Sequence, residues 1–218
     1  MRTKNKAKLN IPYKKEDLHI TKEYGDCSGY YYLPVIGWFY VKRVKMICEL
    51  MRASGKKVLD IGYGSGLLFH ELNNRFCFLS GMDIRKDAKS VKDKLQKSGI
   101  RTNLINGNLF HIPYMDASFD CIVAMSVLEH ISDLEQPVRE MRRVLKDDGE
   151  LICGFPTKNI MMHQFFKLIG FNDDKDHPSS HNYVYKVLKE NFKIEKTIRL
   201  PSFLPMDHCL YVACICRK

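Results

Sequence analysis

The sequence predicts an α/β fold in which a mostly parallel sheet carries helices on both faces. From Lys57 onward, short apolar runs alternate with segments whose apolar residues recur at helical spacing, a succession typical of parallel sheets. A glycine-rich segment directly follows the first apolar run. The last two apolar runs are joined by a short connection from Pro201 to Pro205, which predicts an antiparallel hairpin at one edge.

The individual elements follow from the same periodicities. We expect strands at residues 57–61, 77–84, 102–106, 121–125, 150–155, 193–200 and 209–217. We expect helices at residues 38–53, 67–73, 88–98, 134–145, 159–171 and 183–191. The first helix should stop at Ser54-Gly55, and Asp147-Asp148-Gly149 should form the turn into the fifth strand. The predicted architecture is a doubly wound, Rossmann-like, mostly parallel seven-stranded sheet with an antiparallel edge hairpin.

Length and composition indicate one folded domain. The chain has 218 residues, of which 45% are hydrophobic and 28% are charged, as in ordinary globular proteins. We assign residues 38–218 to this domain, with an inserted cap at about 157–181, and residues 1–37 to an N-terminal arm or lid. No apolar run reaches the roughly 20 residues that span a bilayer, and no apolar stretch follows the basic N-terminus as in a secretory signal. We therefore expect a cytoplasmic protein without a transmembrane segment.

Cysteine content and net charge indicate which metal sites and binding partners to expect. The eight cysteines include no CxxC pair, which predicts buried, reduced thiols and no structural zinc site. The net charge of +10 can attract phosphates or an anionic membrane surface. Part of it lies in the first fifteen residues, and other lysines alternate with acids on an expected helix face at 86–97, a pattern typical of solvated surfaces.

The most informative segment runs from Val58 to Gly66, where a strand leads into a turn with glycines at 62, 64 and 66. Glycine lets a backbone bend sharply and approach a ligand closely. A dinucleotide-binding turn has the pattern Gly-x-Gly-x-x-Gly, whereas here the third glycine comes one place early. Asp60 precedes the first glycine by two residues. A carboxylate there suits a ligand with an ammonium and a sulfonium better than it suits a diphosphate.

A second acidic residue, Asp83, closes the next expected strand, seventeen residues after Gly66. A carboxylate at this position can accept hydrogen bonds from both hydroxyls of a ribose bound over the glycine turn. Helix capping is the alternative, and the following Ile84-Arg85 fits it poorly.

With these motifs the chain resembles the class I S-adenosylmethionine-dependent methyltransferases, and within them the type 11 group that includes quinone-biosynthesis enzymes. The resemblance covers roughly residues 40–156. It rests on Asp-x-Gly-x-Gly-x-Gly with the later Asp83, and on a set of further segments in matching order: Gly107-Asn108-Leu109, Ile112-Pro113, Ser118-Phe119-Asp120, Ser126-Val127-Leu128-Glu129-His130 and Leu145-Lys146-Asp147-Asp148-Gly149.

The resemblance implies S-adenosylmethionine as the cofactor, and it implies a role for each matching position. The methionine and ribose portion would be wrapped by Asp60, Gly62, Tyr63, Gly64 and Gly66. Asp83 would hold the ribose hydroxyls, and Ile84, Asn108 and Leu109 would contact the adenine. Ser126 would lie near the methionine end and the methyl group. Two positions depart from the family pattern, since Asn108 replaces the usual aspartate and Tyr63 replaces a small residue or cysteine. The Tyr63 ring is expected either to narrow the entrance or to pack on the cofactor.

Catalysis by such an enzyme requires mainly alignment of nucleophile, carbon and sulfur. A base is needed only if the acceptor must lose a proton, and His130 is the candidate catalytic residue. The alternative is that Glu129-His130 only anchors the following loop. His177 and His181, with Asp173, Asp174 and Asp176, form a metal set on paper, but the acids cluster in a turn and we expect no metal.

The acceptor class remains open between several alternatives. Motifs expected for methylation of DNA-base amino groups or of cytosine carbon-5 are absent after the fourth strand. We expect a small-molecule, lipid-linked or saccharide-type acceptor. An RNA or protein methyltransferase is the first alternative, because the chain is basic. A non-catalytic cofactor-binding subunit is the second, since fold alone does not establish activity, and a nucleotide-dependent dehydrogenase is the third. Oligomeric state is not predicted.

Overall fold

The computed structural model describes residues 28–53, 55–85, 87–168 and 177–218. Most of the predicted N-terminal arm, and residues 169–176 of the predicted cap with Asp173, Asp174 and Asp176, lie outside the described residues. Among the residues that are described, no helix has the length and apolar character needed to cross a membrane.

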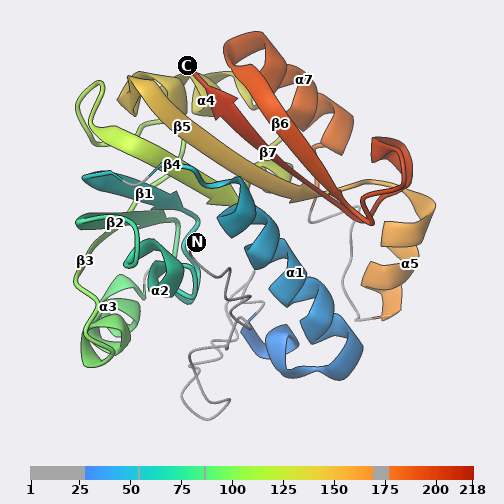
Figure 1. Cartoon of the computed structure of the whole chain (residues 1–218), viewed down its shortest axis with the longest axis horizontal. Coiled ribbons are helices and arrows are strands. Elements are labelled where there is room, and N and C mark those ends of the chain that lie inside the picture. The colour runs from blue at the N-terminus through green and yellow to red at the C-terminus, as the bar shows by residue number, and fades with distance from the viewer. Residues whose placement is uncertain (1–27, 54, 86, 169–176) are drawn as a thin grey trace, which may run out of the picture.

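A seven-stranded sheet forms the centre of the molecule (Figure 1), with the order β3-β2-β1-β4-β5-β7-β6. Neighbouring strands from β3 through β5 are parallel, and β7 is antiparallel to both β5 and β6. The predicted mostly parallel sheet with an antiparallel edge pair is therefore confirmed. The strands are β1 (Lys57–Ile61), β2 (Phe78–Asp83), β3 (Thr102–Asn106), β4 (Phe119–Met125), β5 (Leu145–Pro156), β6 (Lys193–Leu200) and β7 (Tyr211–Arg217).

Helices cover both faces of this sheet, and two hydrophobic clusters result. One cluster joins the sheet to α1 (Pro34–Leu50), α2 (Phe69–Leu72), α3 (Ala88–Lys97) and α5 (Ile160–Leu168). The other joins it to α4 (Glu135–Val144) and α7 (His181–Asn191). Alternate residues of β1 supply the two clusters: Val58 belongs to the first, and Leu59 and Ile61 to the second. Successive side chains of a strand point to opposite faces, so a strand buried on both faces has a nearly continuous apolar sequence.

The first helix differs from the sequence prediction at both ends. It begins at Pro34 rather than Trp38, because proline suits the first turn of a helix. It ends at Leu50 rather than continuing to Ser54-Gly55. The Glu150 carboxylate accepts hydrogen bonds from the backbone N–H groups of Arg52 and Ala53, at 3.2 and 2.7 Å. A side chain distant in sequence therefore engages the amides that would otherwise have extended the helix.

The fifth strand also differs from its prediction. Asp147-Asp148-Gly149 was expected to form a turn before the strand, but β5 already begins at Leu145. Leu145 pairs with Phe119 and Glu150 pairs with Cys121, with a register shift between the two pairs. The three residues thus form an irregularity within the strand. The other strands agree with their predicted limits to within two residues at either end.

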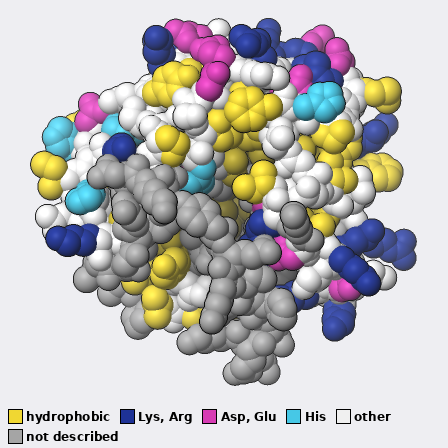
Figure 2. Space-filling view, turned by 180° about the vertical axis from the view of Figure 1, so that it is seen from behind, with side chains coloured by type: hydrophobic (Ala, Val, Ile, Leu, Met, Phe, Trp, Pro, Cys, Tyr) yellow, Lys and Arg dark blue, Asp and Glu magenta, His cyan; other side chains and the backbone are white. Residues whose placement is uncertain are grey.

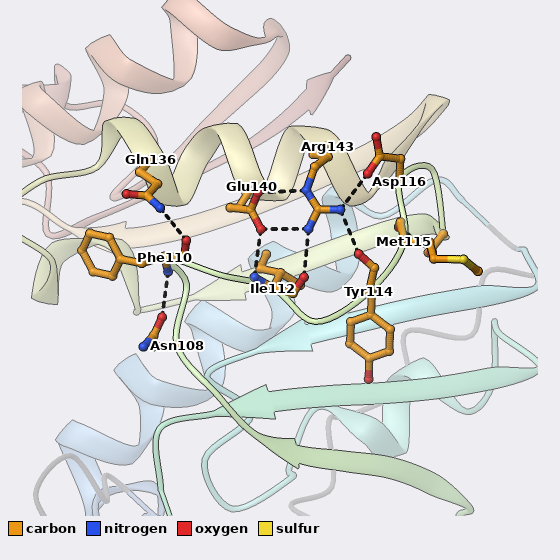
Figure 3. A network of polar contacts seen from close by, with 10 residues as sticks. Asn108, Phe110, Ile112, Tyr114, Met115, Asp116, Gln136, Glu140 and Arg143 are labelled. Atoms are coloured by element: carbon orange, nitrogen blue, oxygen red, sulfur yellow. Dashed lines mark hydrogen bonds and ion pairs between the residues drawn. The ribbon is translucent and has the colours of Figure 1, made fainter.

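The connection between β3 and β4 is held against α4 by a polar network around Arg143 (Figure 3). The guanidinium donates to the carbonyl oxygens of Ile112 and Tyr114, at 2.9 and 2.8 Å, and to the carboxylates of Glu140 and Asp116. Glu140 in turn accepts from the backbone N–H of Ile112 at 2.9 Å. This network matters for the site because the same connection carries Asn108 and Leu109.

The network predicts a pH-dependent contribution to stability. The hydrogen bonds from Arg143, opposed by desolvation and supported by the Ile112 N–H, lower the pKa of Glu140 from 4.5 to about 2. A lowered pKa stabilises the fold above the unfolded-state pKa, and this stabilisation is lost as the pH falls from about 4.5 towards 2. We expect Glu140→Gln to remove a stabilisation on the order of 2 kcal/mol at neutral pH and to flatten the acid limb measured by urea unfolding.

Glu135 lies on the same helix, with a side chain that is 46% exposed and only a 3.8 Å contact to the exposed Arg139, so Glu135→Gln is the matched control and should retain the parent profile. An unchanged acid limb in Glu140→Gln would mean that the network contributes nothing to stability.

Candidate functional site

A pocket lies at the carboxyl ends of β1, β2 and β4, where the strand order reverses. β2 and β3 lie on one side of β1 and β4 lies on the other, and open α/β sheets bind ligands at such a switch point. The pocket has a volume of about 420 Å³, within the range of small-molecule sites. On the face drawn in Figure 2, hydrophobic side chains gather in a recess with charged side chains close to it.

Eight of the predicted site residues line this pocket. They come from the ends of four consecutive strands and from the segments that follow them: Gly62, Gly64, Asp83, Ile84, Asn108, Leu109, Ser126 and His130. Asp60, Tyr63 and Gly66 do not line it. The structure therefore brings most of the predicted set together, and the roles assigned to these residues remain predictions.

The turn after β1 requires glycine for steric reasons. Gly62 has a φ of +67°, and a Cβ at this residue would collide with the side chain of Val127. Gly66 has a φ of +79°, and a Cβ there would lie 2.9 Å from a methyl group of Val91 on α3. Only glycine adopts such angles without strain, so this turn keeps its backbone exposed to the pocket and close to its neighbours.

Asp83 is held in one orientation by backbone donors. Its Oδ2 accepts from the N–H of Gly64 at 2.9 Å, and its Oδ1 accepts from the N–H of Arg85 at 3.0 Å. The residue is 8% exposed, yet it lines the pocket. Each carboxylate oxygen has a further lone pair, so the group can still accept two hydrogen bonds from a ligand.

Asp60 and Tyr63 face the interior. Burial, reinforced by the nearby Asp83 carboxylate, raises the pKa of Asp60 well above its usual value. The Tyr63 ring packs against Phe69, with ring centroids 6.2 Å apart, instead of standing at the pocket entrance. Its hydroxyl is buried without a hydrogen-bond partner among the described residues, and burial raises the pKa of this phenol.

The opposite wall of the pocket is formed by residues that follow β2 and β3. The Ile84 side chain is 75% exposed. The backbone around it is fixed by Asn106, whose amide donates to the carbonyls of Ile84 and Arg85 at 2.8 Å each. Asn108 Oδ1 accepts from the N–H of Phe110 at 3.0 Å, so the Asn108 side chain can still donate through its nitrogen. Leu109 is buried beside it.

Ser126, directly after β4, is surrounded by a polar cluster that sequence reasoning missed. Its backbone has a φ of +58°, and its Oγ lies 3.1 Å from an Arg43 guanidinium nitrogen and 2.9 Å from the Tyr211 hydroxyl. The Arg43 guanidinium also lies over the Tyr40 ring, 3.9 Å from its centroid. Arg43 is only 7% exposed. A buried cation therefore supports the strand end beside which the cofactor methyl group was predicted.

One sequence feature could have pointed to Arg43, because it is a charged residue on an otherwise apolar face of its helix. Arg43 follows Phe39 by four residues and Tyr40 by three, so all three share one side of α1. Other aromatic side chains are found on the N-terminal segment and on α5. Within the described part of the chain, none of these lines the pocket: Tyr30, Tyr31, Tyr32, Trp38, His163, Phe165 and Phe166.

His130 lies on the short 3-10 helix η3 (Leu128–His130) and borders the pocket. Its ring centroid is 4.7 Å from that of His177. His177 and the adjacent Glu129 are both buried. The other histidine considered for a metal, His181, is engaged elsewhere, because its Nδ1 accepts from the Lys158 N–H at 2.9 Å and its Nε2 lies 3.0 Å from Asp207.

Comparison with known proteins agrees with this geometry. Residues 59–153 match the methyltransferase domain family. The chain is 31% identical over 140 residues to the ubiquinone/menaquinone biosynthesis C-methyltransferase UbiE of Haemophilus ducreyi, covering 60% of this chain and 53% of that protein. It is 30% identical over 104 residues to the demethylmenaquinone methyltransferase of Bacillus velezensis, covering 45% of each. The chain thus spans about half the length of the curated relatives it matches.

Among solved structures, the PH0226 protein of Pyrococcus horikoshii superposes with a TM-score of 0.68 at 16% identity, covering 85% of this chain and 92% of that one. This likeness shows a shared fold. The matching domain, the curated relatives and the shared fold agree: residues 59–153 form a methyltransferase domain of the class I S-adenosylmethionine-dependent type, similar to that of quinone-biosynthesis methyltransferases.

Proposed function

We propose that this chain transfers the methyl group of S-adenosylmethionine to a small, lipid-linked acceptor of the quinone type. One observation carries the cofactor part of this proposal. The Asp83 carboxylate stands at the edge of the switch-point pocket, fixed by the N–H groups of Gly64 and Arg85. A carboxylate in this position suits the two hydroxyls of a ribose.

The remaining cofactor contacts follow from the positions around Asp83. The exposed backbone at Gly62 and Gly64 would lie against the ribose and methionine portion, with Asp60, Tyr63 and Gly66 supporting the turn from behind. Ile84 and Leu109 would enclose the adenine, and Asn108 would meet its polar edge. Ser126 would then lie near the methyl group, because the carboxyl end of β4 borders the same pocket.

Methyl transfer needs little chemistry from the protein itself. The acceptor atom attacks the methyl carbon while the carbon–sulfur bond breaks, so the enzyme contributes alignment and exclusion of water. A carbon or oxygen acceptor that must lose a proton requires a base. His130, which borders the pocket beyond Ser126, is the residue we propose for that step.

The acceptor class is supported by the relatives and by the apolar character of the pocket. The curated relatives are named for ubiquinone and menaquinone biosynthesis, and the pocket includes Met82, Val127 and Ile131. A saccharide, RNA or protein acceptor and a non-catalytic subunit remain alternatives from the sequence. The cytoplasmic location expected from the sequence also remains a prediction.

Calorimetric titration of the purified chain with S-adenosylmethionine and, separately, with NADH tests the cofactor. We expect micromolar binding of the first and none of the second. Binding of NADH alone would overturn the cofactor proposal. Incubation with labelled S-adenosylmethionine and short-chain demethylated quinols then tests the acceptor, with an RNA pool and a protein extract as alternative acceptors. Label transfer only to RNA or protein would overturn the quinone part.

The ribose contact can be tested with Asp83→Asn. The amide has one acceptor oxygen and no charge, so it loses hydrogen bonds worth about 1.5–3 kcal/mol each. We expect the Kd for S-adenosylmethionine to rise by roughly 100-fold or more, by calorimetry, while circular dichroism shows an intact fold. Asp93→Asn, at an exposed position on α3, is the matched control. Equal affinity in both variants would mean that the ribose lies elsewhere.

The raised pKa of Asp60 predicts a second pH effect. The folded state holds this proton at a pH where the unfolded chain has released it. Its contribution to stability is therefore full below the unfolded pKa of about 4 and declines as the pH rises towards the folded value. We expect the unfolding free energy of Asp60→Asn to decline less than that of the parent between about pH 4 and 7.

Chemical denaturation at several pH values measures this difference, with Asp93→Asn as the control. Parallel curves for parent and Asp60→Asn would show that the Asp60 carboxyl ionises normally.

A further inference from the structure

A carboxylate and two imidazoles converge at the end of the pocket next to Ser126. Glu129, His130 and His177 each place one potential ligand atom so that all three atoms lie within 4.8 Å of one another. Glu129 is 2% exposed and His177 is 5% exposed, whereas His130 reaches the pocket. The pocket wall at this point also includes Pro178, the neighbour of His177.

Glu129 supplies an independent indication that something is bound here. Its Oε2 is buried and has no hydrogen-bond partner among the described residues. Burying a carboxylate oxygen without a partner is costly unless the group is neutralised or binds a cation. The Glu129 carboxylate belongs to the same cluster as the two imidazoles, so a cation bound among the three side chains would neutralise its charge.

The cluster is assembled by tertiary contacts. Glu129 and His130 lie on η3, and His177 lies on the segment that leads to α7. The Ser179 N–H donates to the Glu129 carbonyl at 3.2 Å, and its hydroxyl donates to the Ile131 carbonyl at 2.5 Å. These bonds tie the His177 segment to η3. Phe166 packs against the His177 ring, with centroids 5.2 Å apart, which gives the site an apolar side.

We propose that Glu129, His130 and His177 bind one divalent first-row transition-metal ion, of the Zn²⁺ or Mn²⁺ class. Two imidazoles and one carboxylate are a ligand set that these ions favour. Ligand atoms around tetrahedral zinc are separated by roughly 3.4 Å, given metal–ligand distances of about 2.0–2.2 Å. The three potential ligand atoms already lie within 4.8 Å of one another, so binding would draw them closer together. The sequence prediction of no metal is thereby revised by this proposal.

A site with three protein ligands leaves a coordination position open. His130 borders the pocket, so the open position would be on the pocket side and would take an oxygen of the acceptor. This second statement rests on the proposed methyl transfer, whereas metal binding does not. With the ion bound, His130 would act as a ligand, and the ion rather than the imidazole would favour the deprotonated form of a hydroxyl acceptor.

Equilibrium dialysis of the full chain against Zn²⁺, after treatment with a chelator and under reducing conditions, tests the site. We expect about one tightly bound ion per chain and a rise in Tm on loading. Glu129→Gln and His177→Asn should each weaken binding at least about 10-fold and abolish the rise in Tm. His208→Asn, an exposed histidine on the connection before β7, should behave as the parent.

Two further measurements identify the ligands of the ion and separate metal binding from cofactor binding. Co²⁺ loading reports the ligand type, and a spectrum with strong thiolate bands would place the ion on cysteines and overturn the proposal. Equal Zn²⁺ binding by the parent and Glu129→Gln, or no stoichiometric binding, would overturn it as well. Titration of the metal-free chain with S-adenosylmethionine is made separately, so failure of the metal site and failure of the cofactor proposal are distinguished.

Discussion

The structure depends on the pairing of β1 with β4 at the centre of the sheet. Val58 to Ile61 pair in parallel with Cys121 to Ala124, and the apolar side chains of both strands are almost wholly inaccessible to solvent. Strands buried on both faces have no room for exposed polar side chains along their length. Polar chemistry is therefore concentrated at the strand ends. Because β2 and β4 lie on opposite sides of β1, the connections that leave these strands diverge there and leave a pocket between them.

Ionisable groups surround this pocket at low solvent exposure. Asp60, Asp83 and Glu129 contribute acids, and Arg43 contributes a cation beside Ser126. Asp83 is compensated by two backbone donors, whereas burial and Asp83 itself disfavour ionisation of Asp60. Burying several ionisable groups in this way is destabilising unless a ligand compensates their charges. It suits a cationic ligand, and the sulfonium and ammonium of S-adenosylmethionine are cations.

The two ends of the pocket are held in different ways. At the end where we propose that the adenine binds, the Arg143 network holds the connection after β3 against α4, and this connection carries Asn108 and Leu109. At the other end, Ser126, Arg43 and Tyr211 come from a strand end, a helix and the antiparallel strand of the sheet. The β5–β7 pairing positions Tyr211 for its contact with Ser126, because Tyr211 is the first residue of β7 and pairs with Pro156. Positioning residues therefore come from nearly the whole length of the described chain.

Much of this arrangement was determined by the sequence itself. Apolar runs and helical spacing predicted the seven strands. The glycine turn and Asp83 predicted one side of the pocket, because these signals lie within about twenty residues of one another, and the family resemblance supplied Ile84, Asn108, Leu109 and Ser126. Tertiary structure alone decided where α1 ends, since Glu150 engages the amides of Arg52 and Ala53 just beyond the helix, and it decided that the Tyr63 ring packs inward. It also brought His177 to Glu129 and His130, and Arg43 to Ser126. These pairs are separated by more than forty residues, and local periodicity carries no information about which distant side chains will meet.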